Sequence, residues 1–240
     1  MRERNGVVYW LGQVEYRPAC ALQAALVEAR KQGRIGDTVL LLEHPHVYTL
    51  GRRGRMDDVL LDRDALTRAG VEVHEADRGG EVTYHGPGQL VGYPIMDIRP
   101  LGGPVRYVRA LEAALMEALA SYGVEGHRQQ GMPGVWVGEP GNERKIAAIG
   151  LRVSRGVSSH GFALNVSTRL SYFEHIVACG VPDLRVTSLE RELGGDVDPA
   201  AVREATAKAL ATHLRMDMHW RSAADIETIL ALEAAGASLL

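Results

Sequence analysis

The sequence predicts an α+β fold in which a mixed β-sheet is flanked by helices. Short apolar and β-branched runs, typical of strands, occur in clusters, and helical patterns lie between and after them. Strands and helices do not alternate regularly, as they would in a chain of βαβ units. The chain contains no internal repeat, low-complexity linker or sharp change of composition. We therefore expect a catalytic core at 1–182 and a helical C-terminal part at 183–240 packed on the same domain.

Composition limits the functions that the chain can have. Its 240 residues are enough to bury a substantial core, and its net charge of -3 argues against a nucleic-acid partner. No apolar run is long enough for a membrane span, and the start has no signal-peptide pattern. Two cysteines, Cys20 and Cys179, are too few for a disulfide scaffold. We expect a cytoplasmic protein with free thiols and no membrane partner.

Strands are expected where short apolar, β-branched and aromatic runs are bounded by Gly, Pro or polar turn residues. The continuous apolar run at 38–43 is short enough to be a buried strand. The last two expected strands are neighbours joined across 154–159 as a hairpin. The expected strands are 7–11, 38–43, 47–50, 71–74, 90–98, 134–138, 145–153 and 160–166.

The clearest helix is expected at 104–122, which begins with Pro104 and is followed by Gly123. Apolar residues recur along it at helical spacing and form one stripe, as in a helix packed on a core. Asp198 is a candidate N-cap for a second long helix. The expected helices are 18–30, 63–69, 104–122, 198–214 and 225–235, and 171–181 is expected to be a short helix or a loop.

The glycine-rich stretch at 78–94, RGGEVTYHGPGQLVGYP, is a candidate ligand loop. Glycine allows backbone conformations and close approaches that other residues resist. The chain has neither a G-x-x-x-x-G-K-[ST] segment nor a G-x-G-x-x-G after a strand, so no nucleotide cofactor is indicated. His44 and His46 flank a proline without nearby Cys or carboxylate partners, and we interpret them as loop residues rather than metal ligands.

Two residues could carry covalent chemistry. Cys179 lies in VACGVPD, where it is either an accessible nucleophile on a turn or a buried small residue. Lys145 opens an apolar strand, where it either reaches into water or, beside a thiol, exchanges a proton with it. His85 and His160 have polar neighbours in the chain and are candidates for a site or for a structural hydrogen bond. Cys20 lies on a helix beside alanines and is interpreted as a core residue.

Several separate motifs, in the same order, resemble the octanoyltransferases of protein lipoylation (lipoyl(octanoyl) transferases, the LipB family). The resemblance covers most of the chain. The motifs are EHPHVYTLGR at 43–52, RGGEVTYHGPGQLVGYPI at 78–95, KIAAIGLRV at 145–153, HGFALNV at 160–166 and ACGVPD with VTSL within 178–189.

The resemblance implies the catalytic fold of the lipoate and biotin protein ligases, with a tunnel for an acyl chain. It implies that octanoyl-acyl carrier protein donates an octanoyl group to an enzyme cysteine, which passes it to a lysine. The acceptors would be the lipoyl domains of 2-oxoacid dehydrogenase E2 subunits and of the glycine cleavage H protein. No cofactor or metal would take part.

Carried over position by position, Cys179 would be the nucleophile that forms the thioester, and Lys145 would be the base. The substrate site would comprise Arg78, Gly79, Gly80, Glu81, Val82, Thr83, Tyr84, His85, Ala148, Ile149, Gly150, Gly161, Phe162 and Ala163. One position departs from the family pattern, because Ala178 stands where a proline commonly precedes the catalytic cysteine. Two alternatives stay open: an ATP-dependent lipoate or biotin ligase of the same fold, and a non-catalytic module that binds an acyl carrier or lipoyl domain.

Overall fold

The computed structural model describes residues 4–226. Its main sheet contains β1 (Arg4–Gln13), β2 (Asp37–Glu43), β6 (Gln89–Ile95), β7 (His127–Gln129), β8 (Met132–Val137), β9 (Arg144–Ser154), β10 (Val157–Asn165) and β11 (Met216–Arg221). Within the described part, these strands are ordered β11-β1-β2-β6-β10-β9-β8-β7. β1 is parallel to β2 and to β11, and the other neighbours are antiparallel. The predicted mixed sheet is confirmed.

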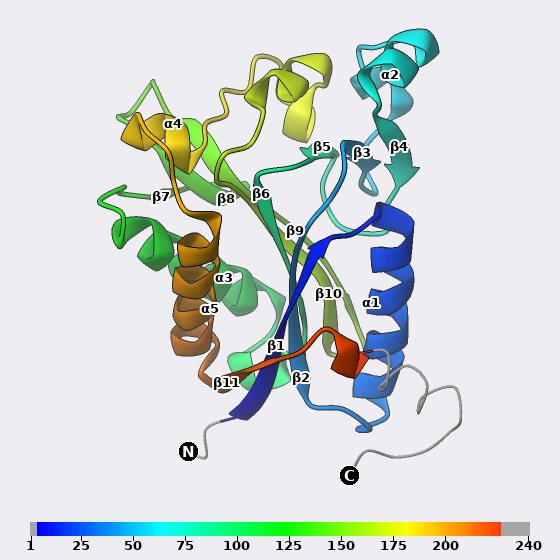
Figure 1. Cartoon of the computed structure of the whole chain (residues 1–240), viewed down its shortest axis with the longest axis vertical. Helices are drawn as coiled ribbons and strands as arrows, with labels where there is room; N and C mark the ends of the chain where they lie inside the picture. The colour runs from blue at the N-terminus through cyan, green and yellow to red at the C-terminus, as the bar shows by residue number, and fades with distance from the viewer. Residues whose placement is uncertain (1–3, 227–240) are drawn as a thin grey trace.

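Helices cover both faces of this sheet (Figure 1). α3 (Pro104–Ala120) and α5 (Pro199–Leu214) lie on one face, and α1 (Tyr16–Lys31) lies on the other. β2 contributes to the apolar cores on both faces of the sheet. Leu41 belongs to the core under α3 and α5, whereas Leu40 and Leu42 belong to the core under α1. Successive side chains of a strand point to opposite faces, so an unbroken apolar run suits a strand that is buried on both sides.

The helix boundaries follow local sequence signals. In α2 (Arg63–Ala69), the Asp62 side chain accepts a hydrogen bond from Ala65 N at 2.7 Å, and Gly70 ends the helix in the left-handed conformation. In α5, the Asp198 side chain accepts from Ala200 N at 2.9 Å. These side chains satisfy backbone donors that the first helical turn leaves without partners. The predicted helices at 63–69 and 198–214 are confirmed, and Asp198 caps the second one as predicted.

A second, smaller sheet stands beside one end of the main sheet. It contains β3 (Val47–Leu50), β4 (Glu72–Glu75) and β5 (Val82–His85), in the order β4-β3-β5. It has its own apolar cluster, in which Tyr48 and Tyr84 are fully buried. In Figure 1 the small sheet lies at the upper end of the molecule, near the yellow segment that follows β10.

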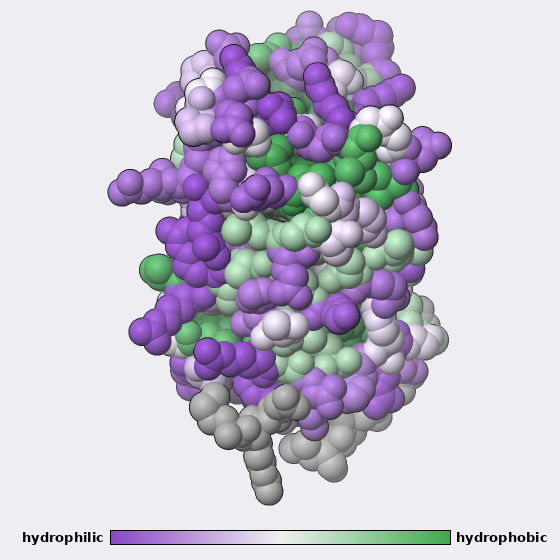
Figure 2. All heavy atoms as spheres, turned by 90° about the vertical axis from the view of Figure 1, so that its left-hand side faces the viewer, coloured by the Kyte–Doolittle hydropathy of each residue, from purple (hydrophilic) through white to green (hydrophobic). Residues whose placement is uncertain are grey.

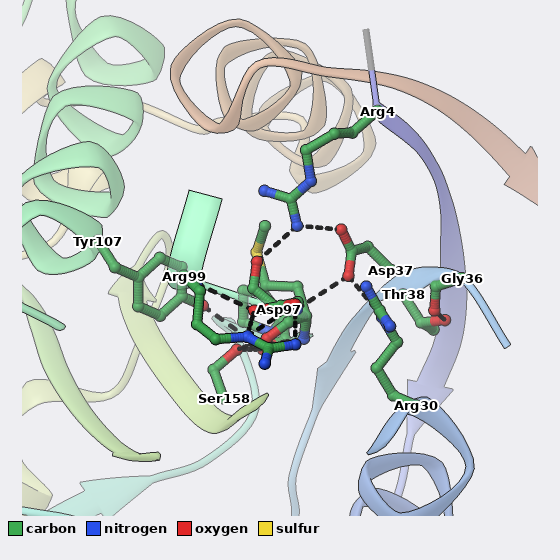
Figure 3. Close-up of polar contacts among 11 residues, drawn as sticks. Arg4, Arg30, Gly36, Asp37, Thr38, Asp97, Arg99, Tyr107 and Ser158 are labelled. Carbon is green, nitrogen blue, oxygen red and sulfur yellow. Dashed lines mark hydrogen bonds and ion pairs between the residues drawn. The ribbon is translucent and has the colours of Figure 1, made fainter. Parts of the chain in front are cut away.

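A polar network fixes the opposite end of the sheet, where β2 begins (Figure 3). The buried Asp37 carboxylate accepts hydrogen bonds from Arg4, from Arg30 Nε at 2.8 Å and from the Asp97 backbone N–H at 2.9 Å. Arg4 also donates to the carbonyl oxygen of Asp97 at 2.6 Å. Removing one partner of a buried ion pair leaves an uncompensated charge. The network therefore holds β1, α1 and the segment after β6 in place around β2.

The surface is mostly polar, with apolar patches. On the face that carries α3, α5 and the β7–β8 hairpin, Figure 2 shows the densest apolar surface toward the upper end, between polar margins. Across residues 4–226, none of the helices combines the length and the hydropathy that a bilayer crossing requires.

The structure differs from the sequence expectations at several elements. The stretch 78–94 is not a single loop, because it contains β5 and most of β6, and the strand expected at 90–98 ends at Ile95. The short elements β7, β11 and α4 (Leu189–Leu193) were not expected, since their partly exposed polar residues mask the periodicity. The helix expected at 225–235 falls almost entirely outside the described residues. The division of the chain at 182/183 stays a prediction.

Candidate active site

Cys179 lies on a tight turn, a single turn of 3-10 helix at Ala178–Gly180. Its backbone is left-handed, with φ 55° and ψ 21°, and Gly180 follows with φ 67°. Holding a non-glycine residue in this conformation costs on the order of 1–3 kcal/mol, which the surrounding structure has to offset. Gly180 N donates to Val177 O at 3.1 Å and closes the turn. The half-buried thiol is thereby carried on a defined backbone.

The segment that carries Cys179 is attached to both sheets. On the side of the small sheet, backbone hydrogen bonds of 2.8 Å join residues 175–177 to residues 58–60. On the side of the main sheet, backbone hydrogen bonds of 2.9 and 3.0 Å join residues 185–187 to Lys145 at the start of β9. The chain thus passes from its pairing with residues 58–60, through the cysteine turn, to the strand that carries the lysine.

Lys145 points toward the thiol. Its Nζ atom lies 3.4 Å from Cys179 Sγ and 5.0 Å from the centroid of the Trp136 ring. The lysine is only 6% exposed, and in the described part of the chain it makes no ion pair with a carboxylate. A buried ammonium without an anionic partner is costly, whereas an adjacent thiolate would supply that partner. Lys145 is therefore placed to exchange a proton with the Cys179 sulfur.

A cavity of about 420 Å³ opens beside this pair. It is walled by β9 and β10 on one side and by the start of the glycine-rich stretch on the other. The predicted residues that line it are Arg78, Gly79, Gly80, Glu81, Val82, Thr83, His85, Lys145, Ala148, Ile149, Gly150, Gly161, Phe162, Ala163 and Cys179. Gly150 and Gly161 permit close backbone approaches in this wall, because a Cβ atom there would lie 3.0 Å from Gly79 O and 2.3 Å from Gly92 O.

Tyr84 is the one predicted site residue that does not line this cavity. It packs in the core of the small sheet, where its ring stacks on Tyr172 at 5.0 Å and its hydroxyl lies 2.7 Å from His46 Nδ1. Neighbouring residues of a strand point to opposite faces, and here Thr83 and His85 take the side of the cavity. Tyr84 therefore packs on the face of β5 opposite to Thr83 and His85.

Arg78 brings a buried positive charge to the cavity. Its guanidinium donates to Thr49 O at 2.7 Å, to Thr49 Oγ1 at 2.8 Å and to Gly79 O at 3.0 Å. Among residues 4–226 it has no carboxylate partner, and its Nε atom has no hydrogen-bond acceptor. Desolvation lowers the pKa of Arg78 from its ordinary value. The site therefore contains two buried cationic side chains, Arg78 and Lys145, which together favour anionic groups.

His85 is buried, although its neighbours in the chain are polar. Its Nδ1 atom lies 2.7 Å from Gln89 Oε1, and Gln89 Nε2 donates to Asn165 Oδ1 at 2.9 Å. Burial, together with the nearby His44 and Arg78, holds the pKa of His85 well below its usual range. His85 is therefore a neutral side chain with a fixed ring in the cavity wall.

His160 forms another part of the wall, with a left-handed backbone at φ 56°. Its Nε2 atom lies 2.7 Å from Asp77 Oδ1, and its backbone N–H donates to Gln23 Oε1 at 2.8 Å. Burial and the charges of Arg78 and Arg152 lower the pKa of His160 to about 4. The ring is neutral near pH 7 and serves as a hydrogen-bonded structural side chain.

The remaining reactive side chains do not line the cavity. Cys20 on α1 is half-buried, and desolvation raises the pKa of its thiol. His44 is buried and hydrogen-bonded to Val14 O and Tyr93. Among the described residues, no group of three or more His, Cys, Asp and Glu side chains could hold a metal ion.

Several cavity residues escaped sequence reasoning, among them Tyr16, Val108, Met132 and Pro133. They come from α1, α3 and β8, elements that are far apart in the chain. Each belongs to an ordinary apolar pattern, so no local signal marks it as part of a site.

Comparisons with known proteins show the family of this chain. Residues 15–211 match the family described as lipoyl protein ligase A/B catalytic domain. An octanoyltransferase of Acidobacterium capsulatum is 53% identical over 193 residues, which cover 76% of this chain and 78% of that protein. An octanoyltransferase of Solibacter usitatus is 55% identical over 179 residues, which cover 74% and 80%.

Solved structures show the same fold at low sequence identity. A bipartite lipoate protein ligase of Thermoplasma acidophilum superposes with a TM-score of 0.73 and 18% identity, covering 96% of this chain and 92% of the other. A biotin protein ligase of Aquifex aeolicus gives a TM-score of 0.50 and 14% identity, covering 88% and 69%. The predicted likeness to the lipoate and biotin ligase fold is thereby confirmed. The chain belongs to the lipoyl protein ligase A/B catalytic domain family and, within it, to the octanoyltransferases.

Proposed function

We propose that this protein moves an octanoyl group from octanoyl-acyl carrier protein to Cys179, and from there to a lysine of a lipoyl domain. The observation that carries the proposal is the 3.4 Å contact between Lys145 Nζ and Cys179 Sγ at the edge of a cavity with small and aliphatic walls. The octanoyltransferase name of relatives at 53 and 55% identity supports the choice of acyl group.

In the first step, the Cys179 sulfur attacks the carbonyl carbon of the donor thioester. A new C–S bond to Cys179 forms, and the C–S bond to the carrier breaks with its electron pair on the carrier sulfur. The proton of the Cys179 thiol passes to that leaving thiolate, and Lys145 is placed to carry it. Thiolate is both a good nucleophile and a good leaving group, so the acyl group can be taken up and released again.

In the second step, the neutral amine of an acceptor lysine attacks the Cys179 thioester. The C–N bond forms, the C–S bond breaks, and the amine proton ends on the Cys179 sulfur. Both steps build negative charge on the carbonyl oxygen, which the buried charges of Arg78 and Lys145 stabilise. The donor is already activated as a thioester, so no nucleotide, metal or other cofactor is required.

The acceptors in this proposal are the lipoyl domains of 2-oxoacid dehydrogenase E2 subunits and the glycine cleavage H protein. The donor and the acceptors are carrier proteins, and the proposal places the reaction in the cytoplasm, without nucleic acid or membrane. The open cavity beside a half-buried thiol suits two large carrier proteins that bring their reactive groups in turn.

An ATP-free transfer assay tests the proposal. The protein is mixed with octanoyl-acyl carrier protein and a lipoyl domain, and intact masses of both proteins are followed. The wild type should form a hydroxylamine-labile octanoyl adduct and then modify the domain. Cys179→Ser should do neither, whereas Cys20→Ser, which replaces the only other cysteine, should do both.

Two outcomes would favour the alternatives. Transfer that requires ATP and free octanoate would indicate a ligase, as in the ATP-bound lipoate-protein ligase A of the same fold. Binding of the carrier or the lipoyl domain without any adduct on the wild type would indicate a non-catalytic module.

A further inference from the structure

A chain of buried amides fixes the direction of every hydrogen bond up to His85. Asn165 Nδ2 donates to Thr187 O at 2.9 Å, and a carbonyl oxygen can only accept. The amide orientation of Asn165 is therefore settled, and its Oδ1 faces Gln89 Nε2 at 2.9 Å. Gln89 Nε2 also donates to Tyr84 O at 3.1 Å. Tyr84 O and Asn165 Oδ1 can only accept, so the group that faces them must be the NH₂ of Gln89. Gln89 must therefore turn its oxygen toward His85.

This orientation assigns the proton of the His85 ring. Gln89 Oε1 lies 2.7 Å from His85 Nδ1, and an amide oxygen cannot donate, so Nδ1 must carry hydrogen. The ring is buried near Arg78, His44 and His160, which disfavour a second proton. In a neutral ring with hydrogen on Nδ1, the Nε2 atom has a free lone pair. Within residues 4–226, no side chain or backbone group donates to that atom.

The acyl group of the donor cannot donate a hydrogen bond to this lone pair. His85 lines the cavity that also holds Cys179 and Lys145. A thioester carbonyl has only acceptor atoms, and a lone pair on Nε2 repels an oxyanion rather than stabilising it. His85 is therefore excluded as a hydrogen-bond donor to the acyl oxygen. In the second step, the acceptor amine brings new N–H bonds to the reacting carbon.

We propose that His85 Nε2 accepts a hydrogen bond from the primary amine of the acceptor lysine. This role rests on the proposed function, because it concerns the second of its two steps. An amine that gives one N–H to His85 can direct its own lone pair at the thioester carbon. As the C–N bond forms and the C–S bond breaks, the electron pair moves to Cys179 Sγ, and the amine proton ends there. His85 is the orienting group, and Gln89 and Asn165 position it.

Imidazole ¹⁵N NMR tests the assigned tautomer without any activity measurement. With ¹⁵N-labelled histidine, the His85 resonances should show a protonated Nδ1 and an unprotonated Nε2 near pH 7. They are assigned by their loss in His85→Gln. His44 provides a reference, because its Nδ1 faces the carbonyl oxygen of Val14 at 2.6 Å. Hydrogen found on Nε2 of His85 would overturn the inference.

Single-turnover kinetics test the role. Acyl-enzyme formation and transfer from purified acyl-enzyme to a lipoyl domain are timed separately by intact mass. In His85→Ala, transfer should slow about tenfold more than acylation, the usual order for one lost hydrogen bond. Gln reaches the position of Nε2 and offers an oxygen there, so His85→Gln should recover transfer. The shorter Asn side chain reaches only the position of Nδ1, so His85→Asn should not recover transfer.

A control variant and the pattern of rate losses distinguish the role of His85 from the proposed function as a whole. His213→Gln, on α5 and outside the cavity, should leave the ratio of the two rates unchanged. Equal losses in both steps, or a loss confined to acylation, would overturn the role of His85 while leaving the acyl-enzyme intact. A wild type that forms no acyl-enzyme would instead overturn the proposed function, and this role with it.

Discussion

Lys145 Nζ lies 3.4 Å from Cys179 Sγ, although the two residues are 34 positions apart. The contact depends on the segment after the cysteine, which returns to run beside the start of β9. An ammonium at this distance makes the thiolate more favourable and the sulfur more reactive.

Replacing Lys145 should slow alkylation of Cys179. In a Cys20→Ser background, Lys145→Met keeps much of the side-chain volume and removes the charge. Iodoacetamide should then modify Cys179 roughly tenfold more slowly near neutral pH, because the thiolate loses its cationic neighbour. Rates are read by mass spectrometry, with Lys208→Met on α5 as the control. Equal rates in the two variants would contradict electrostatic activation by Lys145.

Gly51→Ala should disturb the glycine-rich wall of the cavity. A Cβ atom at Gly51 would meet the carbonyl oxygen of Gly80 at 2.3 Å, so the backbone around Gly80 must move. We expect a loss of about 1–3 kcal/mol in the free energy of unfolding, together with slower acylation. Gly36→Ala is the control, because its Cβ would find only Asn5 O at 3.9 Å. Urea denaturation should show no comparable loss in that variant.

Ala178→Pro should stabilise the cysteine turn. Ala178 is the first residue of the 3-10 turn, and the φ of 3-10 helices in general includes the value that proline imposes. Val177, the preceding residue, has ψ 76°, which lies outside the helical region that a following proline disfavours. Restricting the unfolded chain should raise the free energy of unfolding by about 0.4–1 kcal/mol. Chemical denaturation measures this. A destabilised variant would show that the backbone N–H of Ala178 is needed.

The stability of the protein should fall as the pH falls through the range in which buried histidines gain protons. Desolvation lowers the pKa of His44 from 6.5 to about 4. The unfolded chain therefore binds more protons between these values, and the free energy of unfolding decreases as pH drops from about 6.5 to about 4. His44 alone should contribute roughly 2 kcal/mol of loss between pH 7 and pH 5.

Urea denaturation at the two pH values measures this dependence. His44→Gln should make the loss smaller, because glutamine does not titrate. The same pH dependence in the variant and in the wild type would contradict the assignment to His44.

Much of the fold follows from local patterns. The runs that became β2 and β9 and the helices α3 and α5 combine clear periodicity with proline, glycine or aspartate at their ends. β5 was hidden because its four residues lie between glycines, and it is stabilised by pairing with β3 rather than by its own apolar content. β11 was hidden because polar residues dominate an edge strand whose partner is β1.

The site is only partly visible in the sequence. The resemblance to a family identified Cys179 and Lys145 as partners, but their separation depends on long-range backbone hydrogen bonds. His85 was expected in polar surroundings because of its chain neighbours, and the fold buries it against Gln89 instead. The tautomer of His85 depends on Asn165 and Thr187, which no local pattern connects to it.

The attachment of the cysteine turn to two separate sheets makes catalysis sensitive to their relative motion. The small sheet has its own core, centred on residues such as Tyr48 and Tyr84, and it can loosen without the main sheet melting. Such loosening would release residues 175–177 while residues 185–187 stayed beside Lys145. Gentle heating should therefore abolish turnover before the far-ultraviolet circular dichroism signal changes, so activity reports the integrity of a subdomain rather than that of the whole chain.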